Sequence, residues 1–512
     1  MRNDLRYWAE ATPDKPVLEF EDRPPVTFSE LESSANRFAS LFRSHGLKRG
    51  DHVAVILHNQ PEIISSLWGA YRAGVYLTPV ANSFSATELA YVIENSDAKL
   101  VIVDERFGEK LDRIETLTPG PAHRFIIGRR DGWQTLADAL AAQDDRPVAD
   151  ESPGSLMLYT SGTTGSPKGV IRPLPTREQI GDGPPHFAGY PIGLYGLSPQ
   201  TRYLSTAPLY HAAPMVWAFA VTAAGGTAFV MSKFDPETAL THLETRAITH
   251  SQWVPTMFNR LLALPEERRA AHFAPDHVGA WHAAAPCPVP VKRKMIEWWG
   301  PIINEYYGGS ESVGQTLLTS AEWLERPGTV GRARRGIIHI LDENGQDVPP
   351  GTIGSVYFDP PSKFAYYKDA AKTEAQTSPQ GYQTFGDIGY LDADGYLFLT
   401  DRKNDVIISG GVNLYPQEIE HAVQEVPEVE DCAVAARPDP DFGERPVAFV
   451  RLRAGVGEPN TVVARIREFC KQRLGTTKQP AEIRIVEELP RTETGKILRR
   501  VLRDQLRAES GS

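Results

Sequence analysis

Short apolar runs alternate with helix-like segments along roughly the first 320 residues of this 512-residue chain. The run VAVIL at 53–57 precedes the stretch PEIISSLWGAYRAG, and the pattern repeats through VYLTPV and through KLVIVD at 99–104. Apolar strands that alternate with helices form parallel βαβ units whose sheets are covered on both faces. Because the alternation returns between TAFVM and PIINEYYG, we predict two stacked α/β layers.

The pattern changes after about residue 329. The stretch at 336–360, GIIHILDENGQDVPPGTIGSVYFDP, has short β runs divided by turn residues, which predicts a small antiparallel, barrel-like part. Beyond it, Pro416 and Thr461 are each predicted to open an amphipathic helix of a small α+β unit. The predicted fold is α/β, with a large N-terminal domain at 1–401 and a small C-terminal domain at 402–512.

Composition excludes several classes of function. Apolar residues make up 41% of the chain and charged residues 23%, as in an ordinary globular protein. The net charge of −11 without a basic stripe argues against binding to nucleic acid or to anionic membranes. Three distant cysteines and a start without a secretory signal predict a reducing, cytoplasmic location.

Two features of the sequence resemble a transmembrane span and a metal site, but neither is predicted to be one. The segment at 212–232 carries no charge, but Pro214 and the pair Gly225-Gly226 predict a buried helix, a turn and a strand rather than a transmembrane span. His272, His277 and His282 recur at a spacing of five residues. That spacing does not place them on one helix face, so no metal site is expected there.

The string YTSGTTGSPKGV at 159–170 carries the strongest chemical signal. It follows an apolar strand, and its glycines let backbone N–H groups approach an anion, while hydroxyls and one lysine add donors and charge. A polyphosphate needs such a loop. The candidate phosphate ligands are Thr160, Ser161, Gly162, Thr163, Thr164 and Lys168.

This string resembles the signature loop of the adenylate-forming superfamily, and the chain is most similar to its acyl-CoA synthetases. Further motifs follow in the family's order along the rest of the chain. They are APLYHAAP at 207–214, YYGGSES at 306–312, FGDIGYLDADGY at 385–396, DRKNDVIISGGVNLYPQEIE at 401–420 and RTETGKILRR at 491–500.

The resemblance implies an ATP site. Tyr307 would stack on adenine, with Ala285 at the adenine side, and Ser310 would touch a phosphate or the acyl carboxylate. Glu311 would hold Mg²⁺. By the same resemblance, the remaining two ligands are Asp387, which accepts hydrogen bonds from the ribose hydroxyls, and Arg402, which helps to bind ribose or phosphate.

The resemblance also implies an acid site and a mobile C-terminal domain. The acid would contact Tyr210, His211, Ala283, Ala284 and Tyr306, with His211 between the acyl pocket and the thiol tunnel. Lys496 would bridge the acyl carboxylate and the α-phosphate during adenylation. Asn404 stands at the hinge, where the family usually has Asp or Lys, and Gly410 and Gly411 would line the CoA tunnel.

The implied function is an ATP-dependent acid–thiol ligase that converts a hydrophobic monocarboxylic acid through acyl-AMP to its CoA thioester, with ATP, Mg²⁺ and coenzyme A. A freestanding adenylating enzyme that loads a carrier protein is the alternative. A light-emitting oxygenase on the same fold also stays open, whereas a non-catalytic homologue should have lost Lys496, Glu311 or Asp387. The oligomeric state stays open, a homodimer included.

Overall fold

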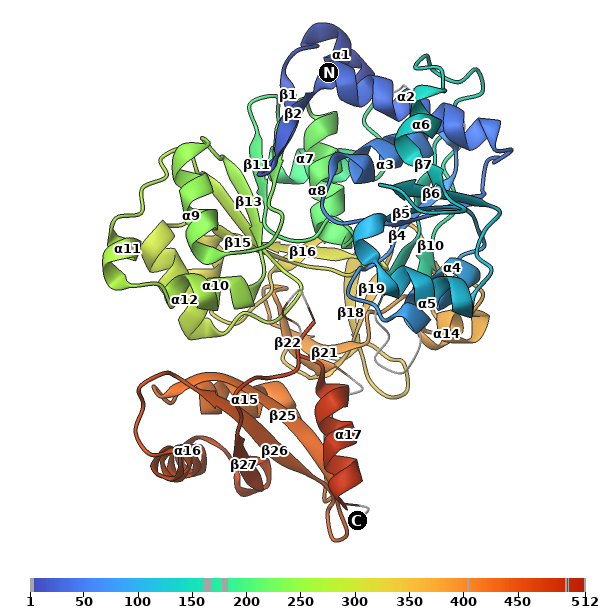
Figure 1. The fold of residues 1–512 in the computed structure, drawn as a ribbon. Helices are drawn as coiled ribbons and strands as arrows, with labels where there is room; N and C mark the ends of the chain where they lie inside the picture. The colour runs from blue at the N-terminus through green and yellow to red at the C-terminus, as the bar shows by residue number, and fades with distance from the viewer. Residues whose placement is uncertain are drawn as a thin grey trace. The chain divides into compact units, whose positions relative to one another are not determined.

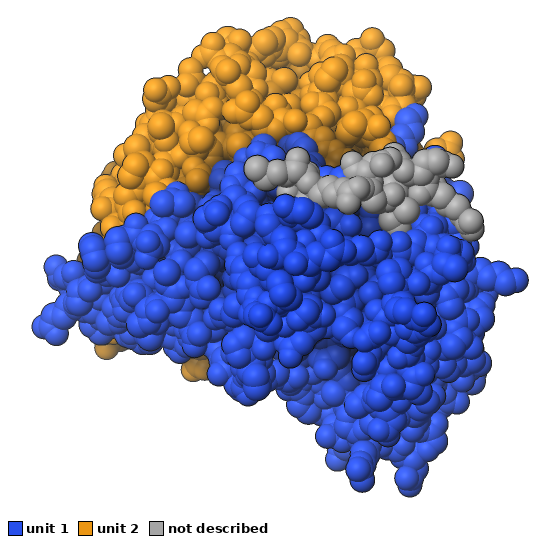
Figure 2. Space-filling model, turned by 90° about the horizontal axis from the view of Figure 1, so that it is seen from above, with its two compact units in different colours: residues 1–253, 263–281, 363–373 blue, residues 254–262, 282–362, 374–512 orange. Residues whose placement is uncertain are grey.

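The computed structural model describes residues 4–160, 167–176, 183–402, 405–492, 495 and 497–510. The chain forms two compact units, which Figure 2 shows in different colours. Unit 1 comprises Met1–Trp253, Ala263–Trp281 and Lys363–Thr373, and unit 2 comprises Val254–Leu262, His282–Ser362 and Glu374–Ser512. Strand β14 (Gly279–His282) and helix α14 (Ala370–Ala375) each contain a boundary between the units.

The first sheet of unit 1 is parallel, with the strand order β7-β6-β5-β3-β4-β8 (Figure 1). Its strands are β3 (His52–Ile56), β4 (Tyr76–Pro79), β5 (Ala98–Asp104), β6 (His123–Ile127), β7 (Gln134–Thr135) and β8 (Ser155–Leu156). Its helices are α2 (Phe28–Ser44), α3 (Pro61–Ala73), α4 (Ala86–Asn95), the turn η1 (Glu105–Phe107), α5 (Glu109–Leu117) and α6 (Leu136–Ala141). The apolar strands and helices predicted from the alternation are therefore present.

The second sheet of unit 1 contains β13-β11-β12-β1-β2, with β14 on the free side of β13. These strands run parallel except for the β1–β2 hairpin. The strands are β1 (Pro16–Phe20), β2 (Arg23–Thr27), β11 (Arg202–Ser205), β12 (Thr227–Val230) and β13 (His250–Trp253). The accompanying helices are α1 (Leu5–Ala11), α7 (Gly189–Tyr195), α8 (Ala212–Ala223), α9 (Pro236–Thr245) and α11 (Glu266–Ala270).

The uncharged segment forms α8, a turn and β12, as predicted. Nine residues of the 12-residue α8 are buried, which explains why the helix is apolar on all sides. Among the described residues, no helix is both long enough and apolar enough to cross a bilayer.

His277 precedes β14, and we expect it to make the stability of the fold depend on pH. It is 7% exposed, and its Nε2 lies 2.7 Å from the Ser251 hydroxyl. Burial, helped by nearby His272 and His250, lowers the pKa of His277 to about 3. Since an unfolded histidine binds its proton near pH 6.5, stability falls as the pH drops below that value.

The free energy of unfolding of the wild-type protein should fall between pH 6.5 and pH 5. We expect this fall to be about 1.5 kcal/mol smaller in His277→Gln. Urea unfolding of both proteins at the two pH values measures this difference. Equal pH dependence in the two proteins would contradict the assignment.

Before its C-terminal part, unit 2 contains two antiparallel ladders, as the turn-rich sequence after residue 329 predicts for part of it. The first has the order β17-β16-β15 and the second the order β18-β19-β21-β22. The strands are β15 (Ile303–Tyr307), β16 (Gln315–Leu318), β17 (Arg332–Arg335), β18 (Ile337–Leu341), β19 (Gly354–Asp359), β21 (Asp387–Leu391) and β22 (Leu397–Arg402). The helices are α10 (Pro255–Leu262), α12 (Val289–Trp299) and α13 (Ser320–Glu325).

The C-terminal part of unit 2 is a small α+β sheet. Its order is β24-β23-β26-β25, and β27 pairs in parallel with β26. Its strands are β23 (Ile407–Ser409), β24 (Val412–Leu414), β25 (Val429–Asp439), β26 (Gly443–Leu452) and β27 (Glu482–Ile485). Its helices are α15 (Pro416–Gln424), α16 (Pro459–Arg473), the turn η4 (Thr476–Lys478) and α17 (Arg499–Ser510).

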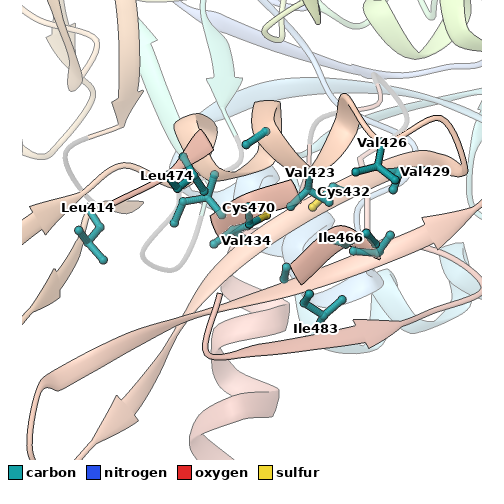
Figure 3. Close-up of a cluster of buried hydrophobic side chains, with 14 of the residues drawn as sticks. Leu414, Val423, Val426, Val429, Cys432, Val434, Ile466, Cys470, Leu474 and Ile483 are labelled. Atoms are coloured by element: carbon teal, nitrogen blue, oxygen red, sulfur yellow. The ribbon is translucent and has the colours of Figure 1, made fainter. Parts of the chain in front are cut away.

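Two apolar clusters hold this sheet between its helices. The cluster in Figure 3 joins α15 and α16 to the sheet through residues such as Val423, Ile466 and Val434. A second cluster joins α17 to the sheet through Leu502 and Leu506. The first predicted helix begins at Pro416 as expected, whereas the second begins at Pro459 rather than Thr461.

Candidate active site

The predicted phosphate loop connects two antiparallel strands of unit 1, β9 (Leu158–Thr160) and β10 (Lys168–Ile171). Strand β20 (Ala365–Tyr366) extends this small sheet. Thr160 and Lys168 are register partners, so the hairpin brings both predicted ligands to the base of the loop. The Lys168 ammonium lies 5.3 Å from the centre of the Tyr366 ring. Ser161, Gly162, Thr163 and Thr164 lie outside the described residues.

Gly169 allows this hairpin to close against a tyrosine. A Cβ atom at Gly169 would lie 2.9 Å from Cζ of Tyr159, so only glycine leaves room for the ring. The Tyr159 hydroxyl in turn donates to Asn95 at 2.6 Å. This contact fixes the start of the loop on unit 1.

Three predicted nucleotide ligands meet in unit 2. The hydroxyl of Tyr307, at the end of β15, donates to Oδ2 of Asp387 at 2.5 Å. Nε of Arg402 lies 3.4 Å from Oδ1 of the same carboxylate. Asp387 and Arg402 are register partners on β21 and β22, which explains how residues far apart in sequence become neighbours. An aromatic ring, a carboxylate and a guanidinium are therefore held together.

The Tyr307 ring is enclosed by two phenylalanines. The ring centres of Phe385 and Phe358 lie 5.5 and 6.3 Å away. Burial, together with the Asp387 carboxylate, raises the pKa of Tyr307 well above its usual value, so the phenol stays protonated and keeps its donor.

Ser310 and Glu311 lie half-buried in the turn between β15 and β16. A Cβ at Gly309 would lie 2.7 Å from the Phe385 ring and 3.0 Å from Oε2 of Glu311, so glycine lets the turn pass close to both. The predicted metal carboxylate is thus next to the Tyr307 group in both sequence and space.

Tyr210 and His211 end the loop that leads from β11 into α8, and their ring centres are 4.5 Å apart. His211 is the N-cap residue of α8. Burial lowers the pKa of His211 to about 4, so its imidazole is neutral at physiological pH. Among the described residues, neither the Tyr210 hydroxyl nor His211 Nε2 has a hydrogen-bond partner.

The remaining predicted acid and adenine contacts lie in unit 2. Ala283, Ala284 and Ala285 follow β14, and Ala284 has φ of +75°. A non-glycine residue in this region marks a tightly constrained turn. Tyr306 lies on β15 and is 9% exposed.

Gly410 and Gly411 form the two-residue turn of the β23–β24 hairpin. Their φ values are +57° and +79°, and Ser409 pairs with Val412 across the turn. Two consecutive left-handed residues are typical of a tight hairpin turn, which is why glycines stand here.

Lys496 and Asn404 lie outside the described residues. Next to Lys496, Gly495 has φ of +77°, and its N–H donates to the Thr492 carbonyl at 2.8 Å. Arg491 contacts both the Gly495 carbonyl and Asp431, the latter at 2.5 Å. Arg491 therefore fixes this turn on β25, a role that the sequence reasoning missed.

A second missed arginine ties α17 to the segment near the predicted hinge. Nη2 of Arg499 lies 2.7 and 2.8 Å from the two Glu420 oxygens, and Nη1 lies 3.6 Å from Asp405. Asp401 accepts from the Gln417 N–H at 3.0 Å, and burial raises the pKa of Asp401 to about 7. The pair Arg499-Arg500 beyond Lys496 was the only sequence signal for this network.

Two family models match this chain. The family described as AMP-binding enzyme matches residues 5–367, and the AMP-binding enzyme C-terminal domain matches residues 418–496. The chain belongs to the AMP-binding enzyme family. The predicted superfamily is thereby confirmed.

Two relatives show to which branch of the family this chain belongs. The 2-succinylbenzoate–CoA ligase of Bacillus licheniformis is 29% identical over 503 residues, 98% of this chain and 99% of the relative. The long-chain-fatty-acid–CoA ligase FadD13 of Mycobacterium tuberculosis is 30% identical over 500 residues, 94% and 93% of the two chains. This AMP-binding enzyme therefore falls in the acyl-CoA synthetase branch, among the AMP-forming CoA ligases.

A solved structure of this branch has the same fold. It is the o-succinylbenzoate CoA synthetase MenE of Bacillus subtilis, in complex with the acyl-adenylate intermediate OSB-AMP. The two chains superpose with a TM-score of 0.80 and 26% identity, over 98% of each. The α/β class is confirmed by this likeness.

Proposed function

We propose that this AMP-binding enzyme activates a carboxylic acid with Mg-ATP and transfers the acyl group to coenzyme A. In the first step a carboxylate oxygen attacks the α-phosphorus, and pyrophosphate leaves. In the second step the CoA sulfur attacks the acyl carbon, loses its proton and expels AMP. The relatives named as CoA ligases support this reaction.

The main support for this proposal is the set of contacts among Tyr307, Asp387 and Arg402. A ring beside a paired carboxylate and guanidinium suits a nucleoside, because the ring stacks on the base and the carboxylate accepts from ribose hydroxyls. Tyr307 and Arg402 already occupy the Asp387 oxygens at 2.5 and 3.4 Å. They hold the carboxylate in place for the ribose.

The phosphates would be bound by the loop between Thr160 and Lys168 and by Ser310. Glu311 would help to hold Mg²⁺, which neutralises phosphate oxygens. The described residues contain no cluster of three or more metal-ligating side chains. A single carboxylate fits an ion that arrives on ATP, because Mg²⁺ keeps waters and phosphates as most of its ligands.

The C-terminal domain, proposed to span 402–512, would supply Lys496 for adenylation and the turn at Gly410 and Gly411 for CoA. Asn404 would act as its hinge. The proposed boundary at 401/402 lies between the two matched ranges, 5–367 and 418–496. His211, neutral and at the start of α8, would separate acid from thiol.

The two named relatives use different acids, one aromatic and one long-chain fatty acid. We propose a largely hydrophobic monocarboxylic acid for this enzyme. Pyrophosphate release from Mg-ATP, measured across ring and chain acids with and without CoA, tests the function. We expect release with one class of acid, sustained only when CoA is present. A single burst that CoA does not relieve would favour a carrier protein as acceptor, and no release at all would refute adenylation.

A further inference from the structure

Contacts run from both ends of the proposed phosphate loop to a single turn of unit 1. The two ends are Thr160 on β9 and Lys168 on β10, which are register partners. The turn comprises residues 95–97, between α4 and β5, and we call it the anchor turn. Helix α4 lies beside the hairpin that carries the loop (Figure 1).

The first contact holds the Thr160 end of the loop. Tyr159 directly precedes Thr160, and its hydroxyl donates at 2.6 Å to Oδ1 of Asn95, the last residue of α4. The Tyr159 ring packs against the buried apolar cluster that contains Leu89 of α4 and Val101 of β5. A hydrogen bond and apolar packing therefore join the start of the loop to the anchor turn.

The second set of contacts holds the Lys168 end. Strand β20 pairs with β10, and just beyond β20 the Tyr367 N–H donates to the carbonyl of Gly169 at 2.8 Å. The Tyr367 hydroxyl donates to Oδ2 of Asp97 at 2.7 Å, and the Lys368 ammonium donates to Oδ1 at 2.6 Å. Asp97 therefore holds the segment that pairs with the residue after Lys168.

The two charged residues of this contact both have left-handed backbones. Asp97, which follows the C-cap residue of α4, has φ of +51°, and Lys368 has φ of +57°. Glycine is the usual residue at such a helix end, and a lysine in this conformation is uncommon. Such strain persists where the surrounding structure fixes the backbone. Here the two strained residues meet through their side chains.

The contact is exposed, so its effect on the stability of the fold is small. The Lys368 and Asp97 side chains are 45% and 52% exposed, and an ion pair at the surface contributes little to stability. Loss of the anchor contacts should therefore leave unit 1 folded. The position of the hairpin should change instead, and donors that bind an anion must be held to within about 0.5 Å.

We propose that the anchor turn positions the phosphate loop for ATP. Asn95 would hold the Thr160 end through Tyr159, and Asp97 would hold the Lys168 end through the segment after β20. Asn95 and Asp97 are thus positioning residues, which act through the loop. This inference rests on the proposed function and gives a role to a turn outside the proposed nucleotide and acid contacts.

Two mild substitutions test the proposal. Asp97→Gly removes the carboxylate and suits the left-handed backbone, whereas Tyr159→Phe removes the hydroxyl and keeps the ring. Calorimetry gives the Kd of Mg-ATP, and competition against ATP gives the inhibition constant of adenosine, which has no phosphate. We expect the Kd of Mg-ATP to rise about five-fold in each variant and about 20-fold in the double variant. The adenosine constant should stay within about two-fold of wild type, because the loop contacts only phosphates.

Two matched variants provide the controls. Ala247→Gly places glycine at another left-handed position of unit 1, between α9 and β13, where Ala247 has φ of +48°. Tyr203→Phe removes a hydroxyl that lies 3.1 Å from Gln252 Oε1 on the second sheet. Both variants should bind Mg-ATP as the wild type does.

Two results would overturn the inference while leaving the proposed function intact. One is a double variant that binds Mg-ATP with wild-type affinity. The other is an equal loss of affinity for Mg-ATP and for adenosine, which would show a general structural role. If the wild-type protein did not bind Mg-ATP, the proposed function itself would be refuted, and the inference with it.

Discussion

Lys496→Ala is expected to slow formation of acyl-AMP by about 10²–10³-fold. The acyl carboxylate and the α-phosphate are both negative, and a compact cation between them stabilises the charge that develops as they join. Thioester formation from supplied acyl-AMP and CoA should keep most of its rate, because that step does not join two anions. Pyrophosphate exchange measures the first half-reaction, and thioester formation from synthetic acyl-AMP measures the second.

Lys471→Ala provides the control for this variant. Lys471 lies on α16 of the same region, and its side chain is 63% exposed beside Glu468. Removal of this charge should leave both half-reactions unchanged. If Lys496→Ala slowed both half-reactions equally, the proposal that Lys496 acts in adenylation and not in thioester formation would be wrong.

Lys292→Met is expected to lower the free energy of unfolding by about 3–5 kcal/mol. Lys292 on α12 is fully buried, and its Nζ lies 2.5 Å from Oε2 of Glu305 and 5.1 Å from the centre of the Trp323 ring. His282, also fully buried, has Nε2 3.6 Å from the same carboxylate oxygen. Without Lys292, Glu305 would be a buried carboxylate without its cation.

The double variant Lys292→Met/Glu305→Leu separates charge pairing from packing. Since it removes both charges, we expect its stability to lie closer to wild type than that of Lys292→Met. Urea unfolding of the three proteins tests this order. Burial already raises the pKa of Glu305, so the cost of Lys292→Met should shrink at pH 5, where the carboxyl protonates more readily. Additive effects of the two substitutions would contradict the pairing argument.

The sequence by itself predicted the repeated local structure. The strand and helix pattern, the turn-rich antiparallel region and the helix at Pro416 follow from periodicity and from turn residues, which act over a few neighbouring positions. The predicted start of the second C-terminal helix, Thr461, is two residues too late. The helix begins at Pro459 because proline is favoured in the first turn of a helix. Helix α7 was missed because it has only seven residues, among them two glycines and a proline. Helix α17 was missed although Leu502 and Leu506 recur at helical spacing on its buried face.

The sequence also determined the family, because the motifs between residues 159 and 500 occur in a fixed order that composition cannot imitate. What those motifs do together depended on the tertiary structure. The Tyr307–Asp387 contact joins residues 80 positions apart, and the register of β21 with β22 sets the position of Arg402.

The tertiary structure alone brought together side chains that no local pattern links. Nothing in the local sequence links Tyr195, Trp217 and Trp281, which come from two helices and one strand and meet only in the folded core. Burial likewise depends on packing across the chain, so the lowered pKa of His211 has no sequence signal. Local propensity and motif order therefore determined the elements and the family, whereas long-range packing determined which side chains meet and how deeply they are buried.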